Sequence, residues 1–368
     1  MSQAISQANV HANPQANMQA SSQAHQLIVE RREWADRHYY TVRDDSSAEG
    51  VVVYPFPIDE MECERLDMLH CLIHDHALEG RSYMSDLRPT SRRQKVLDVG
   101  CGTGIYCYEV ARSNPNLDVV GIDLFDMVPG RMPQNTRIVT PIDFNLPSWP
   151  FAAREFDLIR NAGLSGSVQD WGSHIRKCYH YLRSGGFWES LEIDWMPQIR
   201  QDYRPTPEEI AEVGSEERWW QRTMHEIGPV QRWSECMQDA SRRLGKPLGY
   251  PGNMQHLLEA EGFDRFIHKV DRLHLKPQII DEFGVRRYAD NDSAECSIEN
   301  LVKCSMFQME ERTERGQTYS YAPVLEGLSM YLLTQCCEPR WDPASVRELC
   351  LDVAKTCYSK RRPVYFNL

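Results

Sequence analysis

The sequence lacks an apolar run approaching the roughly 20 residues that span a bilayer. Its N-terminus has neither the basic start nor the apolar stretch of a secretory signal, so we expect neither a membrane nor a secreted protein. None of the 12 cysteines forms a Cys-X-X-Cys pair, and a chain of 368 residues can build a core without disulfides. We therefore expect free thiols in a reducing compartment, either the cytoplasm or the nucleus.

Positive charge is also in deficit. Lys and Arg number 41 against 53 Asp and Glu, which gives a net charge of −12. An anionic surface repels phosphate backbones, so we expect no direct binding of nucleic acid. Hydrophobic residues make up 41% and charged residues 26% of the chain, as in ordinary soluble folded proteins.

Composition and pattern divide the chain into four parts. A Gln-, Ala- and Ser-rich beginning has too few large apolar residues to fold. Further on, Asp59 and Glu62 have capping-box spacing before an amphipathic helical pattern. We expect a disordered tail (1–25), an N-terminal helical segment (26–94), a ligand-binding domain (95–278) with a helical insertion (197–260), and a C-terminal helical extension (279–368) with helices at 324–337 and 343–358.

The third part alternates short apolar runs with helix-length segments. This alternation is typical of a mostly parallel sheet with crossover helices, so we predict the doubly wound α/β class. The expected strands are 95–100, 118–123, 136–143, 156–161 and 186–194, with a sixth within 261–277.

A glycine-rich loop follows the first of these strands. The sequence Asp98-Val-Gly100-Cys-Gly102-Thr-Gly104 stands between an apolar strand and a helix-compatible stretch. Glycines in such a turn permit positive φ and close approach of a ligand to bare backbone, and the helix N-terminus offers unpaired N–H groups. The loop predicts a nucleotide-like ligand, although the spacing is GxGxG rather than the dinucleotide GxGxxG.

Acidic residues end the next two strands. Asp123 is placed to accept both hydroxyl hydrogens of a ribose, and Asp143 with Phe144 suits an adenine amino group and ring face. Together with the glycine loop these residues favour S-adenosylmethionine as cofactor. NAD, or a tight turn with ordinary strand-end aspartates, remains as an alternative.

These motifs resemble a known family. DVGCGTG, GIDLF, PIDFNLPSWPF, FDLIRNAGLSGSVQDW and YLRSGGFWESLEI, with the upstream YPFPIDEMECERLDMLHCL, look like a class I S-adenosylmethionine-dependent methyltransferase of the fungal LaeA-like family. The resemblance implies a Rossmann-like seven-stranded sheet and a role in fungal secondary metabolism. It also implies that Tyr106 is the aromatic residue that follows the glycine loop. Cofactor-binding residues carried over by the resemblance are Asp98, Gly100, Gly102, Gly104, Asp123 and Asp143.

The end of the sequence departs from that pattern. Family members usually finish with a short strand after the last helix, whereas this sequence stops at VYFNL. Either VYFNL replaces the seventh strand or that strand is missing, and its loss would leave a gap between neighbouring strands.

Candidate catalytic residues stand at the ends of the fourth and fifth strands. Asn161 could bind an acceptor hydroxyl or amine, and Asp194 and Trp195 could line the acceptor pocket. Each could also be structural. Trp219 and Trp220 could form a lid over a flat acceptor, although aromatics on a helix face are more often core.

Other features favour structural roles. His70 and His74 are four residues apart with His76 nearby, but the glutamate of HExxH is absent and we expect no metal. Cys101 lies in the glycine loop, where a helix N-terminus could lower the pKa of its thiol, but we expect it to be a small side chain that fills the turn. The basic clusters 92–95 and 360–362 are weak nuclear signals.

We therefore expect transfer of a methyl group to an oxygen or nitrogen of a small molecule in secondary metabolite biosynthesis. The alternative is a nuclear regulator of secondary metabolism genes that acts through protein partners.

Overall fold

The computed structural model describes residues 28–43, 54–74, 78–199, 204–270, 272–274, 279–280, 286–287, 296–297, 321–358 and 364–367. The tail expected at residues 1–25 lies outside this set.

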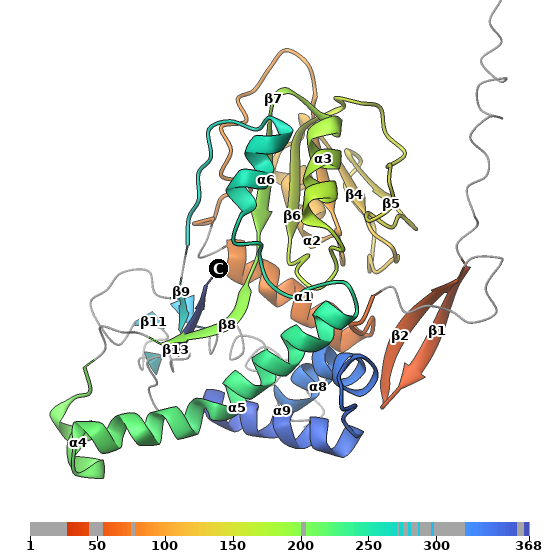
Figure 1. Ribbon diagram of the computed structural model, residues 1–368. Coiled ribbons are helices and arrows are strands. Elements are labelled where there is room, and N and C mark those ends of the chain that lie inside the picture. Colours follow the sequence, from red (N-terminus) through yellow and green to blue (C-terminus); the bar gives the residue numbers. More distant parts are fainter. Residues whose placement is uncertain are drawn as a thin grey trace, which may run out of the picture.

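A five-stranded, wholly parallel sheet forms the centre of the upper layer in Figure 1. The strand order places the first strand next to both the second and the fourth, so the chain reverses direction at the first strand. In open α/β sheets the crevice at such a reversal is where ligands bind. The order is β5 (Thr136–Val139), β4 (Leu117–Ile122), β3 (Gln94–Val99), β6 (Phe156–Ala162) and β7 (Leu182–Leu191).

Helices cover both faces of this sheet. On one face α2 (Ile105–Ser113) packs Val110 onto a cluster with Val96. On the other face α3 (Trp171–Tyr181) and α6 (Met254–Glu261) pack over a cluster that contains Leu97. Because neighbouring strand residues point to opposite faces, strands that bury both faces read as continuous apolar runs. The predicted doubly wound α/β class is confirmed.

The single strand expected at residues 186–194 is divided between two strands. The strand is interrupted at residues 192–193 and resumes as β8 (Asp194–Ile199), which belongs to a second, four-stranded sheet. The expected sixth strand is short, at β9 (Arg272–His274), which pairs in parallel with β12 (Cys296–Ser297). A separate pair joins β10 (Ile279–Ile280) and β11 (Arg286–Arg287).

The seventh strand is present. Residues of β13 (Val364–Asn367) pair antiparallel with both β8 and β9 and lie between them. Of the two alternatives, the first is confirmed: the VYFN segment takes the place of the seventh strand and supplies backbone partners to β8 and β9.

The N-terminal segment begins with a hairpin rather than with the expected helix. β1 (Ile28–Trp34) and β2 (Arg37–Arg43) pair across a two-residue turn in which Ala35 and Asp36 have positive φ values of 49° and 64°. This is the backbone sign of the tight hairpin turn that matches the twist of paired strands. Buried and partly buried residues alternate along 37–41, as expected for a strand with one covered face.

The helix expected after Asp59 is α1 (Glu60–Leu72). The Asp59 carboxylate accepts from the Glu62 backbone N–H at 3.1 Å and from Arg37 Nε at 2.6 Å. The Glu62 carboxylate accepts instead from Arg65, at 2.8 Å from Nε, so the observed cap ties the helix start to the hairpin.

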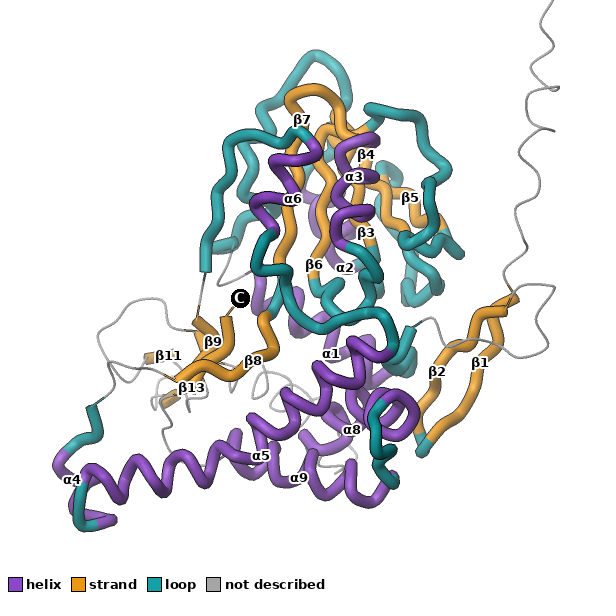
Figure 2. The backbone as a smooth tube through the Cα atoms, in the orientation of Figure 1, coloured by secondary structure: helices purple, strands orange, loops and turns teal. Residues whose placement is uncertain are grey.

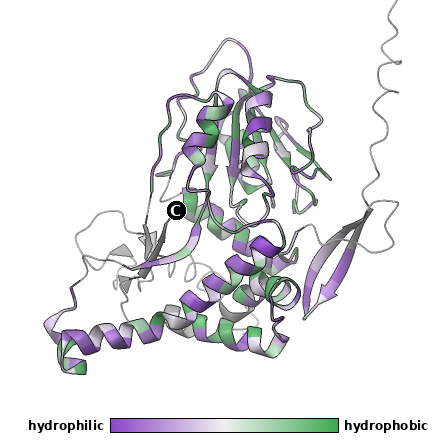
Figure 3. Ribbon diagram, in the orientation of Figure 1, coloured by the Kyte–Doolittle hydropathy of each residue, from purple (hydrophilic) through white to green (hydrophobic). Residues whose placement is uncertain are grey.

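A helical layer lies below the central sheet (Figures 1 and 2). In it α5 (Glu216–Arg243) packs against α9 (Pro343–Tyr358). Trp233 Nε1 of α5 donates to Ser329 Oγ of α8 (Tyr321–Tyr331) at 2.7 Å. Hydrophilic residues predominate along the long α5 in Figure 3. The predicted C-terminal helices are confirmed. Thr206 and Glu209 form a capping box, with Pro207 in the first turn of the helix that follows. The remaining elements are α4 (Pro207–Val213) and a π-helical turn (Leu332–Cys336).

Candidate functional site

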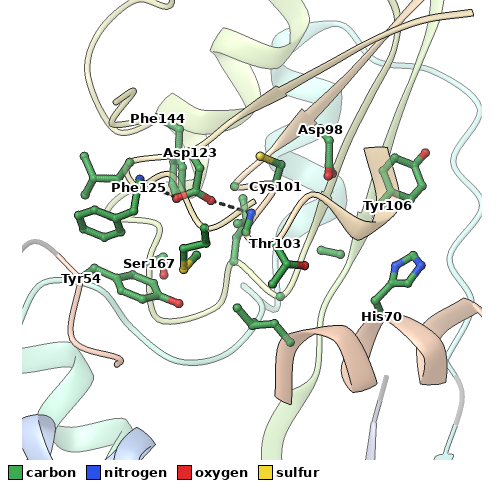
Figure 4. A pocket seen from close by; sticks show the side chains of 18 of the residues that line it. Tyr54, His70, Asp98, Cys101, Thr103, Tyr106, Asp123, Phe125, Phe144 and Ser167 are labelled. Carbon is green, nitrogen blue, oxygen red and sulfur yellow. Dashed lines mark hydrogen bonds between the residues drawn. The ribbon is translucent and has the colours of Figure 1, made fainter. Parts of the chain in front are cut away.

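A pocket lies at the carboxyl ends of β3, β4 and β6, beside the point where the strand order reverses (Figure 4). Its wall contains seven of the eight residues predicted to bind a cofactor. They are Asp98, Gly100, Gly102, Tyr106, Asp123, Asp143 and Phe144. The eighth, Gly104, is the N-cap of α2.

The glycine loop has the backbone that its sequence predicts. Gly100, Gly102 and Gly104 have φ values of 67°, 54° and 76°. A Cβ on Gly100 would stand 2.5 Å from Leu164 Cδ2, so a side chain at this position would have to displace Leu164. A Cβ on Gly102 would meet nothing nearer than Leu66 Cδ1 at 3.6 Å. Gly102 thus presents bare backbone to open pocket space.

The Asp123 carboxylate, at the end of β4, accepts a hydrogen bond from the glycine loop. Its Oδ2 accepts from Gly102 N at 2.8 Å and its Oδ1 from Phe125 N at 3.1 Å. Burial raises the pKa of Asp123 to about 6. A carboxylate has about four lone-pair sites, so it can accept two hydroxyl hydrogens in addition to these N–H bonds.

Asp143 and Phe144 line the same side of the pocket. Asp143 Oδ1 accepts from the backbone and the side chain of Asn145, at 2.8 and 3.1 Å. Lys246, from the turn after α5, also lines the wall there, and burial lowers the pKa of its ammonium group. Lys246 gave no signal in the sequence, because a lone lysine after a helix is ordinary.

The opposite end of the pocket is polar and deeply buried. Asp98 Oδ1 is 3.2 Å from Arg160 Nη1, and the side chains are 4% and 3% exposed. The Arg160 guanidinium carbon lies 3.8 Å from the centre of the Tyr106 ring. His70 from α1 contributes Nε2, 2.7 Å from Glu109 Oε2, and burial lowers the pKa of His70.

The helix α1 covers one side of the pocket. Leu66, Leu69 and Ile73 line it with apolar surface, and Thr103 Oγ1 in the glycine loop donates to Asp67 at 2.5 Å. The sequence predicts this helix but not its position over the loop, because helix–loop contacts depend on tertiary packing.

Comparisons with known proteins agree with this geometry. A family model described as a methyltransferase domain matches residues 75–240. The chain is 31% identical over 253 residues to the protein-methionine methyltransferase laeA of Emericella nidulans, covering 68% of this chain and 60% of that protein. It is also 31% identical over 232 residues to the secondary metabolism regulator laeA of Monascus pilosus, covering 62% and 56%. The chain is a LaeA-like class I methyltransferase.

This LaeA-like chain spans between 55% and 62% of the length of the curated relatives that it matches. Solved structures also match. Coclaurine N-methyltransferase bound to N-methylheliamine and SAH has a TM-score of 0.38 at 10% identity, over 82% of this chain and 68% of that one. An S-adenosylmethionine-dependent methyltransferase from Mesorhizobium loti has a TM-score of 0.32 at 18% identity, over 50% and 80%.

In this LaeA-like chain the three candidate catalytic residues do not line the pocket. Asn161 is fully buried; its Nδ2 donates to Ser190 Oγ at 2.7 Å and its Oδ1 accepts from Trp188 Nε1 at 2.9 Å. Asp194 Oδ1 accepts from the backbone N–H two residues later, at 3.2 Å. Trp195 packs edge-on against Trp233 in the helical layer, with ring centres 6.2 Å apart.

The break after β7 explains why Asp194 and Trp195 do not line the pocket. Glu192 turns inward and accepts from the backbone N–H groups of Leu164 and Ser165 at 3.1 and 2.9 Å. The strand therefore resumes as β8 in the second sheet, and it carries Asp194 and Trp195 away from the pocket.

Two further pairs of residues singled out in the sequence contact each other. Trp219 and Trp220 meet edge to face at 5.0 Å near the start of α5, and neither lines the pocket. The rings of His70 and His74 have centres 6.1 Å apart, whereas His76 lies outside the described residues. Within the described ranges no group of three His, Cys, Asp or Glu is placed to hold a metal ion, and no helix is long and apolar enough to cross a membrane.

Proposed function

We propose that the protein transfers a methyl group from S-adenosylmethionine to an oxygen or nitrogen of a small molecule. The observation that supports this most is that the glycine loop, Asp123 and Asp143 line one pocket at the strand reversal. Each supplies what one part of this cofactor needs: bare backbone, a ribose acceptor and an acceptor for the adenine amino group.

The residues present fit the cofactor. Gly102 leaves free the space that a Cβ would occupy, and Asp123 keeps unused lone pairs after accepting from Gly102 and Phe125. Phe144 offers a ring beside Asp143 for the adenine face. When bound, the sulfonium would supply an electrophilic methyl group.

The protein's contribution to methyl transfer is placement. Holding an acceptor in line can supply about 7–11 kcal/mol of the barrier without a dedicated base. The apolar side chains of Leu66, Leu69 and Ile73 cover the pocket and keep water from the acceptor. A pocket covered by α1 in this way favours a small acceptor over a folded protein surface.

Methyl-labelled cofactor tests the activity directly. Purified protein is incubated with labelled S-adenosylmethionine and either the small-molecule fraction or the protein fraction of cells that contain the gene. We expect label in a small molecule, detected by mass spectrometry. Absence of label from both fractions, with no cofactor binding by calorimetry, would end the proposal.

A second candidate function has its own support. Relatives bear the names secondary metabolism regulator and protein-methionine methyltransferase, which favours regulation or a protein acceptor. This candidate requires nuclear localisation, whereas the first requires only the cytoplasm. In the basic cluster 92–95, Arg92 pairs with Asp157, and Lys95 Nζ lies 2.8 Å from Glu155, so these charges are engaged as ion pairs. The cluster 360–362 lies outside the described residues.

Replacement of the gene separates the two functions. A Gly102→Ala allele should let an unmethylated precursor accumulate while transcripts of biosynthetic genes stay constant, and a Gly80→Ala allele should behave as wild type. If transcripts fall and no precursor appears, the regulatory function takes the place of the small-molecule one.

A further inference from the structure

Charged residues occupy one register position in three neighbouring strands of the central sheet. Asp98 in β3 pairs in register with Arg160 in β6, and Arg160 pairs with Glu189 in β7. Buried positions of a parallel sheet are normally apolar, and burying charge is costly unless the charge is paired. The burial of the Arg160 guanidinium in β6 therefore requires a partner for its charge.

The contacts of Arg160 leave most of its hydrogen-bonding capacity unused. A guanidinium has five N–H donors. Its Nη1 donates to Asp98 at 3.2 Å, while its Nε is buried with no acceptor among the described residues. The Tyr106 hydroxyl, on the ring that the guanidinium covers, is likewise buried without a partner there. Glu189 Oε1 accepts from the backbone N–H groups of Met84 and Ser85, whereas its Oε2 is buried without a partner among the described residues.

This unused capacity stands at one end of the pocket. In Figure 4, Asp98 and Tyr106 lie on the opposite side of the glycine loop from Asp123 and Phe144, and Arg160 lines the same pocket. If the nucleoside occupies the Asp123 side, the rest of the cofactor extends over the loop toward Asp98 and Arg160. That part is an α-amino acid with one ammonium and one carboxylate group.

The charges at this end match such a zwitterion. Asp98 and Arg160 carry opposite charge, and both are nearly inaccessible to solvent. Arginine binds carboxylates through paired N–H donors, and such bonds are strong where water is excluded. A lysine would offer a point charge without this planar arrangement of donors.

We propose that Arg160 binds the carboxylate of the cofactor's amino-acid moiety, with Asp98 as the partner of its ammonium group. This inference rests on the proposed function, because it assumes that the pocket takes S-adenosylmethionine. It assigns Arg160 a role in cofactor binding in addition to its ion pair with Asp98.

Decarboxylated S-adenosylmethionine is the probe that isolates this contact, because it keeps the nucleoside, the sulfonium and the ammonium group. By calorimetry, the wild-type protein should bind S-adenosylmethionine about 10- to 100-fold more tightly than the decarboxylated compound, the range for hydrogen bonds to a charged group. In Arg160→Gln this preference should fall to about 3-fold or less, and Arg160→Lys should keep part of it. Arg176→Gln, on the exposed side of α3, is the matched control and should keep the wild-type preference.

Each result distinguishes between roles. If Arg160→Gln weakens binding of both compounds by the same factor, Arg160 only neutralises Asp98 and the inference is overturned. Should that variant fail to fold, the wild-type comparison still decides, because equal affinity for the two compounds excludes recognition of the carboxylate. A wild-type protein that binds neither compound refutes the proposed function itself.

Discussion

Replacing Gly102 by alanine should separate cofactor binding from folding. At this position φ is +54°, and a Cβ would have its nearest neighbour at 3.6 Å, which is ordinary contact. The folded state therefore bears only the cost of a left-handed alanine, about 1–2 kcal/mol, and Tm should fall by about 1–3 °C. The added methyl group occupies the space in which a ligand would contact the backbone. Overpacking of about 1–3 kcal/mol there corresponds to a Kd raised about 5- to 150-fold.

The matched control is Gly80→Ala. Gly80 has φ +76° and no atom within 4 Å of its Cβ position, and it is outside the pocket wall. It should lose similar stability in thermal denaturation and keep wild-type affinity for S-adenosylhomocysteine in calorimetry. If Gly102→Ala binds as tightly as wild type, or if Gly80→Ala loses affinity to the same extent, Gly102 does not contact the ligand.

Three other outcomes follow from buried groups. Burial raises the pKa of Asp123 to about 6, so cofactor affinity should weaken by up to about tenfold from pH 7 to pH 5, where the carboxylate is protonated. The Asp123→Asn variant should bind the cofactor weakly at both pH values. A wild-type affinity that does not change with pH would contradict this expectation. Burial raises the pKa of Glu192 to about 7, so the folded state binds the carboxyl proton of Glu192 more tightly than the unfolded chain does. The free energy of unfolding should therefore fall by about 3 kcal/mol as pH rises from 4.5 to 7. Glu192→Gln should remove that part of the slope in denaturant titrations, and equal slopes would show that Glu192 titrates normally. Leu97→Ala, at a fully buried position in β3, should cost about 2–5 kcal/mol, whereas a cost under about 1 kcal/mol would mean that the sheet centre repacks freely.

Local chain order was enough to predict the sheet and one wall of the pocket. The carboxyl ends of neighbouring parallel strands meet at one edge, so Asp98, Asp123 and Asp143 had to converge once the strands were identified. The hairpin was missed because its turn residues, Ala35 and Asp36, are not the Asn-Gly type that announces such a turn.

The remainder of the site depends on contacts that are distant in sequence. The inward turn of Glu192 that redirects β8 depends on backbone N–H groups at 164 and 165, which no local pattern of residues 186–194 encodes. The way in which α1 covers the pocket likewise depends on how this helix packs against the glycine loop. Arg160 did carry a signal, since a charged residue in a strand of a buried parallel sheet needs a partner.

The place of β13 between β8 and β9 bears on the order in which the protein acquires its structure. The register joins Val364 to Ile199, so two strands that pair in the finished sheet are made far apart in time during synthesis. Contacts so distant in sequence form slowly, because a long loop must close before they contribute any stability. Until then the backbone of β8 is an open strand edge, and such edges can pair with other chains. Nascent copies of this protein therefore pass through an interval of exposure to aggregation, during which chaperones would have most effect on yield.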